Sequence, residues 1–219
     1  LASGIYRVNP QEQGVVLRFG EFVRTTQPGL HYHLPSPVEK VITPDVTREK
    51  KIEIGYRGFG VCTANRRDEP DESKMITGDE NNIDIDFVVF WKISDAGKYL
   101  FNLQDPPETV KVAAQSIMRD IIGQTKIQTA LTGGRQNIQL TAKSLLQDLL
   151  NQYEAGVEIR DVQLLSVDPP QEVIDAFNDV QRARQDRDTL INEAEAIRND
   201  IVPRARGEAA QMINEAQAY

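Results

Sequence analysis

Two histidines placed two residues apart are the first candidates for chemistry in this sequence. His31 and His33 follow a turn at Gln27-Pro28-Gly29. Side chains two apart on a strand share one face, so the pair could bind a metal ion. No third ligand lies close in the sequence, and two surface-facing histidines explain the pattern as well. We therefore predict no metal site.

Other reactive residue types lack the partners that catalysis needs. Cys62 has no histidine near it, and the carboxylate pairs Asp79/Glu80 and Asp84/Asp86 lie at the polar start of a strand, where acids usually serve solubility. The sequence contains no GxSxG, HExxH or phosphate-loop motif. We predict a protein that is not an enzyme, with no catalytic residue and no cofactor. A hydrolase with a site assembled from distant residues is the alternative.

An apolar and aromatic stretch after the turn is a candidate for membrane contact. Leu30-His31-Tyr32-His33-Leu34-Pro35 alternates amphipathic and apolar side chains, and we expect Phe22 across the hairpin. Tyrosine and similar side chains suit a bilayer surface. The alternative is that these are half-buried strand residues. The predicted membrane contacts are Phe22, Leu30, Tyr32 and Leu34.

Composition excludes several other classes of protein. The net charge is −8 over 219 residues, and this acidic balance argues against binding of nucleic acid. A single cysteine excludes an internal disulfide and a cysteine metal cluster. No run of about 20 apolar residues is present, so we expect none of these residues to span a membrane.

The first part of the chain predicts an antiparallel sheet. Strand-like runs cover residues 5–8, 15–26, 30–34, 38–42 and 46–56, and the run 30–34 returns across the turn at 27–29. The clearest strand covers residues 83–93, where apolar side chains alternate with period two. Between them, the mixed charges of residues 57–74 predict a long exposed loop.

Helices follow that strand. Asp95 and Asp105 are placed to cap helices over residues 96–101 and 106–122, and further helical patterns cover 126–131 and 135–153. A last strand over residues 157–167 changes its alternation phase near Arg160-Asp161, through a bulge or through burial on both faces.

The last 50 or so residues predict one long helix with an unusual repeat. Asp168-Pro169-Pro170 is expected to open it directly after the strand. Steps of three, four and four residues give a period of eleven, which is typical of a straight or slightly right-handed supercoil. Two rows of this repeat form the predicted helix-packing interface: Val180, Ile191, Val202 and Ile213 in one, and Ala183, Ala194, Ala205 and Ala216 in the other.

So thin an apolar stripe buries little area within one chain. We therefore expect neighbouring helices of the same kind to flank it; the alternative is an ordinary amphipathic helix folded back on its own domain. Pro203 lies within the pattern and predicts a bend, since proline lacks the N–H of a helix interior.

Four motifs, in order along the chain, resemble the SPFH or band-7 family, which includes stomatin, prohibitin, flotillin and the HflK/HflC pair. They are residues 13–20 (QGVVLRFG), 28–31 (PGLH), 77–81 (TGDEN) and 169–177 (PPQEVIDAF). The long segment before Met75 and the Ile-Tyr-Arg-Val start most resemble the HflK/HflC branch.

The resemblance implies properties that the residues alone do not reveal. Members of this branch carry an N-terminal transmembrane anchor and place the SPFH body on the periplasmic side of the bacterial inner membrane. Sibling subunits alternate in a closed hetero-oligomeric cage around the protease FtsH. The expected partners are thus an HflC-like sibling subunit, FtsH and the lipid bilayer, with a stomatin- or prohibitin-like lipid organiser as the alternative.

Together these observations predict an α+β fold with three parts. They are a mostly β subdomain over residues 1–93, an α+β subdomain over 94–168, and a coiled-coil-like assembly helix over 169–219 that is kinked near Pro203.

Overall fold

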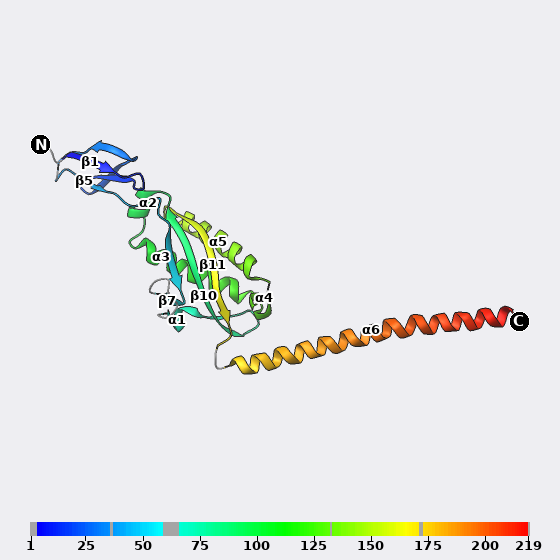
Figure 1. Ribbon diagram of the computed structural model, residues 1–219. Coiled ribbons are helices and arrows are strands. Elements are labelled where there is room, and N and C mark those ends of the chain that lie inside the picture. Colours follow the sequence, from blue (N-terminus) through cyan, green and yellow to red (C-terminus); the bar gives the residue numbers. More distant parts are fainter. Residues whose placement is uncertain (1–3, 36, 59–65, 132, 171–172, 219) are drawn as a thin grey trace. The chain divides into compact units, whose positions relative to one another are not determined.

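The computed structural model describes residues 4–35, 37–58, 66–131, 133–170 and 173–218. The chain forms two compact units, Leu1–Asp168 and Pro169–Tyr219. The first combines antiparallel sheets with helices, and the second is a long helix (Figure 1). The predicted α+β class with a long C-terminal helix is confirmed.

The start of the first unit is a small β lobe, which we define as residues 4–42. Strand β1 (Ile5–Val8) pairs with β4 (Gly29–Tyr32) in a two-stranded ribbon. Strand β2 (Gly14–Arg18) lies between β3 (Glu21–Thr26) and β5 (Glu39–Ile42). All of these pairs are antiparallel.

Two details of this lobe differ from the prediction. Residues 15–26 do not form one strand, because Phe19 and Gly20 both have positive φ, 52° and 94°, and turn the chain between β2 and β3. Strand β4 pairs with β1 instead of β3, so Phe22 faces Leu17 of β2 in the register. The expected hairpin across residues 27–29 was therefore wrong.

The rest of the first unit is built on a second sheet. Its centre is β10 (Asn82–Ile93), which pairs with β11 (Val157–Asp168) on one side and with β6 (Lys50–Ile54) and β9 (Lys74–Ile76) on the other. Strand β10 lies before the predicted subdomain boundary between residues 93 and 94, and β11 lies after it. The two strands nevertheless pair in one sheet.

Helices cover this sheet. Helix α3 (Pro106–Gly123) packs on α5 (Arg135–Gln152), and these contact β6 and β11, with α4 (Ile127–Leu131) beside α5. Asp95 caps α2 (Ala96–Phe101) by accepting hydrogen bonds from the backbone N–H groups of Gly97 and Lys98. Asp105 caps α3 in the same way. The largest fully buried side chains between the layers include Trp91, Phe87, Ile85, Met118, Ile122 and Leu146.

The predicted loop over residues 57–74 is partly structured. Short elements occupy it: β7 (Tyr56–Gly58), β8 (Arg66–Asp68), α1 (Pro70–Ser73) and the start of β9. Glu72 on α1 accepts hydrogen bonds from Arg57 and Lys111 at 2.6 and 2.7 Å, which ties this segment to α3. Residues 59–65, including Cys62, lie outside the described part of the chain.

The phase change in β11 is a bulge, as one of the two interpretations expected. The register with β10 shifts between Phe90 and Trp91, where Asp161 and Ile159 are the paired residues and Arg160 is passed over. A second shift lies between Asp86 and Phe87. The bulges let apolar residues on both sides of the shift face the helices.

Helix α6 (Ile174–Ala218) is one continuous helix of 45 residues that contains Pro203. It does not start directly after the strand, because Asp168 is the last residue of β11 and its carboxylate binds the hydroxyl of Ser166. The prediction that Asp168-Pro169-Pro170 opens the helix directly after the strand was therefore wrong. The kink near Pro203 stays a prediction.

Candidate assembly and membrane-contact surfaces

Helix α6 leaves its apolar side chains open to solvent. Val180, Ile191, Val202 and Ile213 are 41–58% exposed, and the alanines of the second predicted row are exposed as well. A sheet strand such as β10 buries the same residue types completely. Exposed apolar rows of this length are typical of a surface that another molecule covers.

The structure reveals a third apolar row that the sequence analysis missed. Leu190, Ile201 and Met212 are 55–67% exposed and recur every eleven residues, each one position before a residue of the first row. At about 100° per residue, the alanine row lies between these two rows of larger side chains. The apolar face is therefore a broad stripe, and the alanines form its shallow centre. The same eleven-residue spacing in the sequence could have revealed this row.

Ion pairs occupy other positions on α6. Arg182 pairs with Asp179 at 2.9 Å and Arg204 with Asp200 at 3.1 Å, and all four side chains are mostly exposed. Exposed pairs of this kind contribute little to stability. The helix thus has a charged solvent face in addition to its apolar stripe.

The ribbon of β1 and β4 carries the candidate membrane contacts. Leu30 and Tyr32 lie on one face of β4, and the register places Arg7 and Ile5 of β1 opposite them. Ile5, Leu30 and Tyr32 are 59–75% exposed. Leu34, just after the ribbon, is also exposed. The structure thus adds Ile5, which the sequence analysis did not select, to this surface.

Phe22, the remaining predicted membrane contact, lies elsewhere. Its ring centroid is 5.7 Å from that of Phe101, at the end of α2. The ring also approaches Gly97 closely. The structure therefore places Leu30 and Tyr32 on one face of β4 but packs Phe22 against α2.

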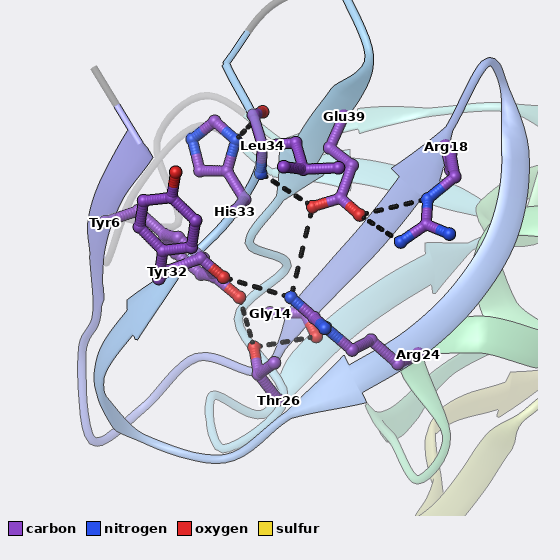
Figure 2. A network of polar contacts seen from close by, with 9 residues as sticks. All are labelled: Tyr6, Gly14, Arg18, Arg24, Thr26, Tyr32, His33, Leu34 and Glu39. Atoms are coloured by element: carbon purple, nitrogen blue, oxygen red, sulfur yellow. Dashed lines mark hydrogen bonds and ion pairs between the residues drawn. The ribbon is translucent and has the colours of Figure 1, made fainter. Parts of the chain in front are cut away.

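A buried carboxylate holds the ribbon to the rest of the β lobe (Figure 2). Glu39 accepts hydrogen bonds from the backbone N–H of Leu34 at 2.9 Å and from the Arg18 guanidinium at 2.8 and 3.2 Å. Arg24 lies 4.0 Å from the same carboxylate and donates to the carbonyl oxygen of Tyr32 at 3.0 Å. These contacts fix the end of β4 relative to β2 and β5.

The charge state of Glu39 follows from these contacts. The backbone N–H of Leu34 and the guanidinium of Arg18 hold the pKa of this carboxyl below its usual range, against the opposing effect of burial. Glu39 is therefore ionised at neutral pH. Two arginines share this one carboxylate, and their guanidinium groups stay about half exposed.

The two histidines share a face, as predicted, but the face is the inner one of the ribbon. Their rings flank Tyr6, with centroids 5.8 Å away for His31 and 5.4 Å for His33. Each binds a backbone carbonyl oxygen, that of Gln27 or Leu34. Within the described ranges, no cluster of three or more His, Cys, Asp or Glu side chains is placed to hold a metal ion.

None of the helices in the described part of the chain is both long and apolar enough to cross a bilayer. Helix α6 has the length but carries many charged residues.

Comparison with known proteins places this chain in a family. The family described as "SPFH domain / Band 7 family" matches residues 6–198. The protein HflK of Borreliella burgdorferi is 36% identical over 218 residues, which cover 99% of this chain and 70% of that protein. HflK of Treponema pallidum is 38% identical, with 95% of this chain and 65% of that protein covered.

A more distant relative has a functional name. The Escherichia coli K12 protein named "Modulator of FtsH protease HflK" is 32% identical over 211 residues, which cover 96% of this chain and 46% of that protein. The chain thus spans about two thirds of the spirochaete relatives and about half of the E. coli relative.

Proposed function

Since the chain belongs to the SPFH domain / Band 7 family, we propose that it is a non-catalytic scaffold subunit of a membrane-bound assembly. In this proposal, α6 packs beside the same helix of neighbouring subunits, including an HflC-like sibling, and the helices form the wall of a cage. The cage surrounds the protease FtsH and limits which membrane proteins reach it.

One observation carries the proposal: α6 is a continuous helix of 45 residues whose three apolar rows are exposed. A fully buried Ile or Leu side chain contributes about 1.5–3 kcal/mol. Covering these rows by neighbouring helices therefore stabilises an assembly strongly. The eleven-residue spacing suits nearly straight helices packed side by side.

The partner and the location rest on the relatives and on the ribbon. A relative is named as a modulator of FtsH protease. We place the body on the periplasmic face of the inner membrane, anchored by a helix N-terminal to these residues. Leu30, Tyr32, Leu34 and Ile5 then touch the bilayer surface. Phe22 was also predicted from the sequence as a membrane contact, but its packing on Phe101 favours a structural role.

Charge placed on the apolar stripe tests the assembly. We expect Ile191→Asp with Ile213→Asp, in the full-length protein extracted in detergent, to shift the protein to smaller species in analytical ultracentrifugation. An unchanged distribution would contradict the proposal. Co-purification from membranes should recover FtsH and the sibling subunit with the wild-type protein and less of both with the variant.

The matched control adds the same charge to the opposite face. Thr189 and Gln211 are exposed and lie two positions before Ile191 and Ile213, which is about 200° around the helix. Thr189→Asp with Gln211→Asp should therefore leave the distribution unchanged. An equal effect of both pairs would indicate general destabilisation of the helix instead of a packed face.

The exposed ribbon supports a second candidate, a stomatin- or prohibitin-like organiser of lipid domains without a protease partner. The two candidates differ in co-purification, because only the first requires FtsH. Recovery of the assembled protein without FtsH under mild extraction would favour the lipid organiser.

A further inference from the structure

The outer face of the ribbon of β1 and β4 carries three apolar or amphipathic side chains and one arginine. In the register, Ile5 lies opposite Tyr32, and Arg7 lies opposite Leu30. Residues directly opposite each other in an antiparallel pair point to the same side of the ribbon. The four side chains therefore form one patch, and all of them are exposed. We call Ile5, Arg7, Leu30 and Tyr32 the ribbon patch.

The opposite face of the ribbon packs on the rest of the β lobe. Tyr6 and Val8 lie on this face, since the residues of a strand alternate between its two sides. The Tyr6 hydroxyl forms a hydrogen bond with the Thr26 hydroxyl at 3.0 Å, and Val8 is only 2% exposed. The ribbon thus uses its inner face for folding and leaves the ribbon patch for contact with another molecule.

Arg7 is the one charged side chain of the ribbon patch. The sequences of β1 and β4 contain no aspartate and no glutamate. Within the described ranges, no carboxylate forms an ion pair with Arg7, whereas Arg18 and Arg24 share the carboxylate of Glu39. The positive charge of Arg7 is therefore available to an anionic partner.

The β lobe also lacks the acidic excess of the whole chain. The net charge of the chain is −8. Within the lobe, four cationic side chains outnumber three acidic ones: Arg7, Arg18, Arg24 and Lys40, against Glu12, Glu21 and Glu39. Glu39 is buried, and Glu21 lies opposite Arg18 in the register of β2 and β3. An anionic surface is consequently repelled least by this part of the chain.

The side chains of the ribbon patch match the two layers that a phospholipid bilayer offers. Ile5 and Leu30 are apolar and suit the acyl boundary, and the ring of Tyr32 with its polar hydroxyl suits the interface. An arginine has an apolar stem and a guanidinium group that binds phosphate through two parallel hydrogen bonds. The stem of Arg7 can therefore lie along Leu30, its partner across the ribbon, while its head reaches the headgroup layer.

We propose that the ribbon patch binds a bilayer rich in anionic phospholipids, with the Arg7 guanidinium on a headgroup phosphate and the other three side chains at the acyl boundary. The inference rests on the bilayer contact in the proposed function and adds the class of lipid. Every phospholipid has a phosphate, but phosphatidylcholine carries its own cation next to it. Phosphatidylglycerol has no such cation, so its phosphate gains more from Arg7.

Vesicle binding tests this preference. The chain of 219 residues is mixed with sucrose-loaded vesicles of phosphatidylcholine alone or of an equal mixture of phosphatidylcholine and phosphatidylglycerol, and the bound fraction is measured after sedimentation. We expect tighter binding to the mixture, although the net charge of the chain is negative. Raising the salt concentration should reduce this advantage, because salt screens exposed charges. Equal binding to both kinds of vesicle would overturn the inference.

A variant without the charge at Arg7 assigns the preference to this residue. Arg7→Gln should weaken binding to the mixture about fivefold, which is typical of one arginine near an anionic surface, and leave binding to phosphatidylcholine unchanged. The matched control is Arg48→Gln, which removes the same charge at an exposed position between β5 and β6. It should change binding to neither kind of vesicle. An equal loss with both variants would show that only net charge matters, and the inference would fail.

Leu30→Gln separates apolar contact from attraction by charge. It should weaken binding to both kinds of vesicle, because it removes an apolar side chain that the acyl boundary covers. If binding to both stays at the wild-type level, the ribbon patch is not the bound surface and the inference is wrong. Arg7 and Leu30 are exposed, so urea denaturation should give both variants the stability of the wild type.

The bilayer contact and the lipid preference fail in different ways. If the wild-type chain binds both kinds of vesicle equally and Leu30→Gln releases it from both, the bilayer contact stands and the lipid preference fails. If the wild-type chain binds neither, both fail. The packing of α6 is tested separately, by the charge substitutions at Ile191 and Ile213.

Discussion

The two units of the chain differ in how far they bury their apolar side chains. The first unit buries Trp91, Phe87 and Ile85 to 1% exposure or less, whereas α6 leaves Ile191 and Ile213 half exposed or more. The first unit therefore supplies its own stability, and we expect the second to depend on helices that pack against it. Substitutions should accordingly change folding in one unit and association in the other.

The largest effect is expected in the buried core of the first unit. Trp91→Ala removes a side chain that stacks near Tyr99, with ring centroids 5.9 Å apart, and lies under the ammonium group of Lys50. We expect a loss of about 3–5 kcal/mol in the free energy of unfolding, measured by urea denaturation. A loss below 1 kcal/mol would contradict the contrast between the units.

The next effect is a pH dependence of the first unit. Burial alone would raise the pKa of Glu72, but hydrogen bonds from Arg57 and Lys111 outweigh it and lower the pKa from 4.5 to about 2. A lowered folded-state pKa gives stability that is present above about pH 4.5 and lost as the pH falls toward 2.

The Glu72→Gln variant tests this dependence. At pH 7 we expect the free energy of unfolding of this variant to be about 2–3 kcal/mol lower than that of the wild type. The difference should vanish near pH 2. Denaturation curves between pH 2 and 7 give the comparison. A difference that does not change with pH would show that the lost contact is not electrostatic.

A smaller effect is expected at the turn before β10. Asp79 accepts hydrogen bonds from the Thr77 hydroxyl at 2.6 Å and from the backbone N–H of Ile127, the first residue of α4, at 3.0 Å. Asp79→Ala should therefore cost about 1 kcal/mol of stability. Glu80→Asn is the control for the lost charge, because Glu80 is an exposed neighbour of Asp79. Asn is chosen over Ala because Glu80 has a positive φ, which Asn tolerates better.

The smallest effect is expected on α6. Ile191→Ala should change the free energy of unfolding of the first unit by less than about 0.5 kcal/mol, because the side chain contacts solvent within the chain. The same variant should weaken association in ultracentrifugation. A large loss of stability in the unassembled chain would instead indicate that α6 folds back on its own body.

Local patterns predicted the elements well and their pairing less well. The alternation over residues 83–93 and the caps at Asp95 and Asp105 are local signals, and the structure confirms them. The pairing of β4 with β1 depends on contacts between distant residues, so the turn at 27–29 suggested the wrong neighbour. Phe22 was misplaced for the same reason, since Phe101 lies far away in the sequence.

The candidate surfaces show a similar division. The repeat that begins at Val180 was visible in the sequence, but the row of Leu190, Ile201 and Met212 was missed because only the positions reached by steps of three, four and four from Val180 were followed. Phe19 looked like a strand residue, since it lies between two strand-like runs, residues 15–17 and 22–23, whose apolar side chains hide the turn. Residues 66–76 carry few apolar side chains, so their short strands and helix gave no periodic signal.

Pro203 has a mechanical consequence for α6. Because proline has no N–H, the carbonyl oxygen of Asn199 lacks its partner in the helical ladder, although the helix continues on both sides. The helix therefore bends most easily near Pro203, which lies closer to the C-terminal end of α6 than to its start at Ile174. In the proposed assembly, a bend at this point would leave the apolar stripe of each helix continuous and would allow a wall of such helices to curve inward and close.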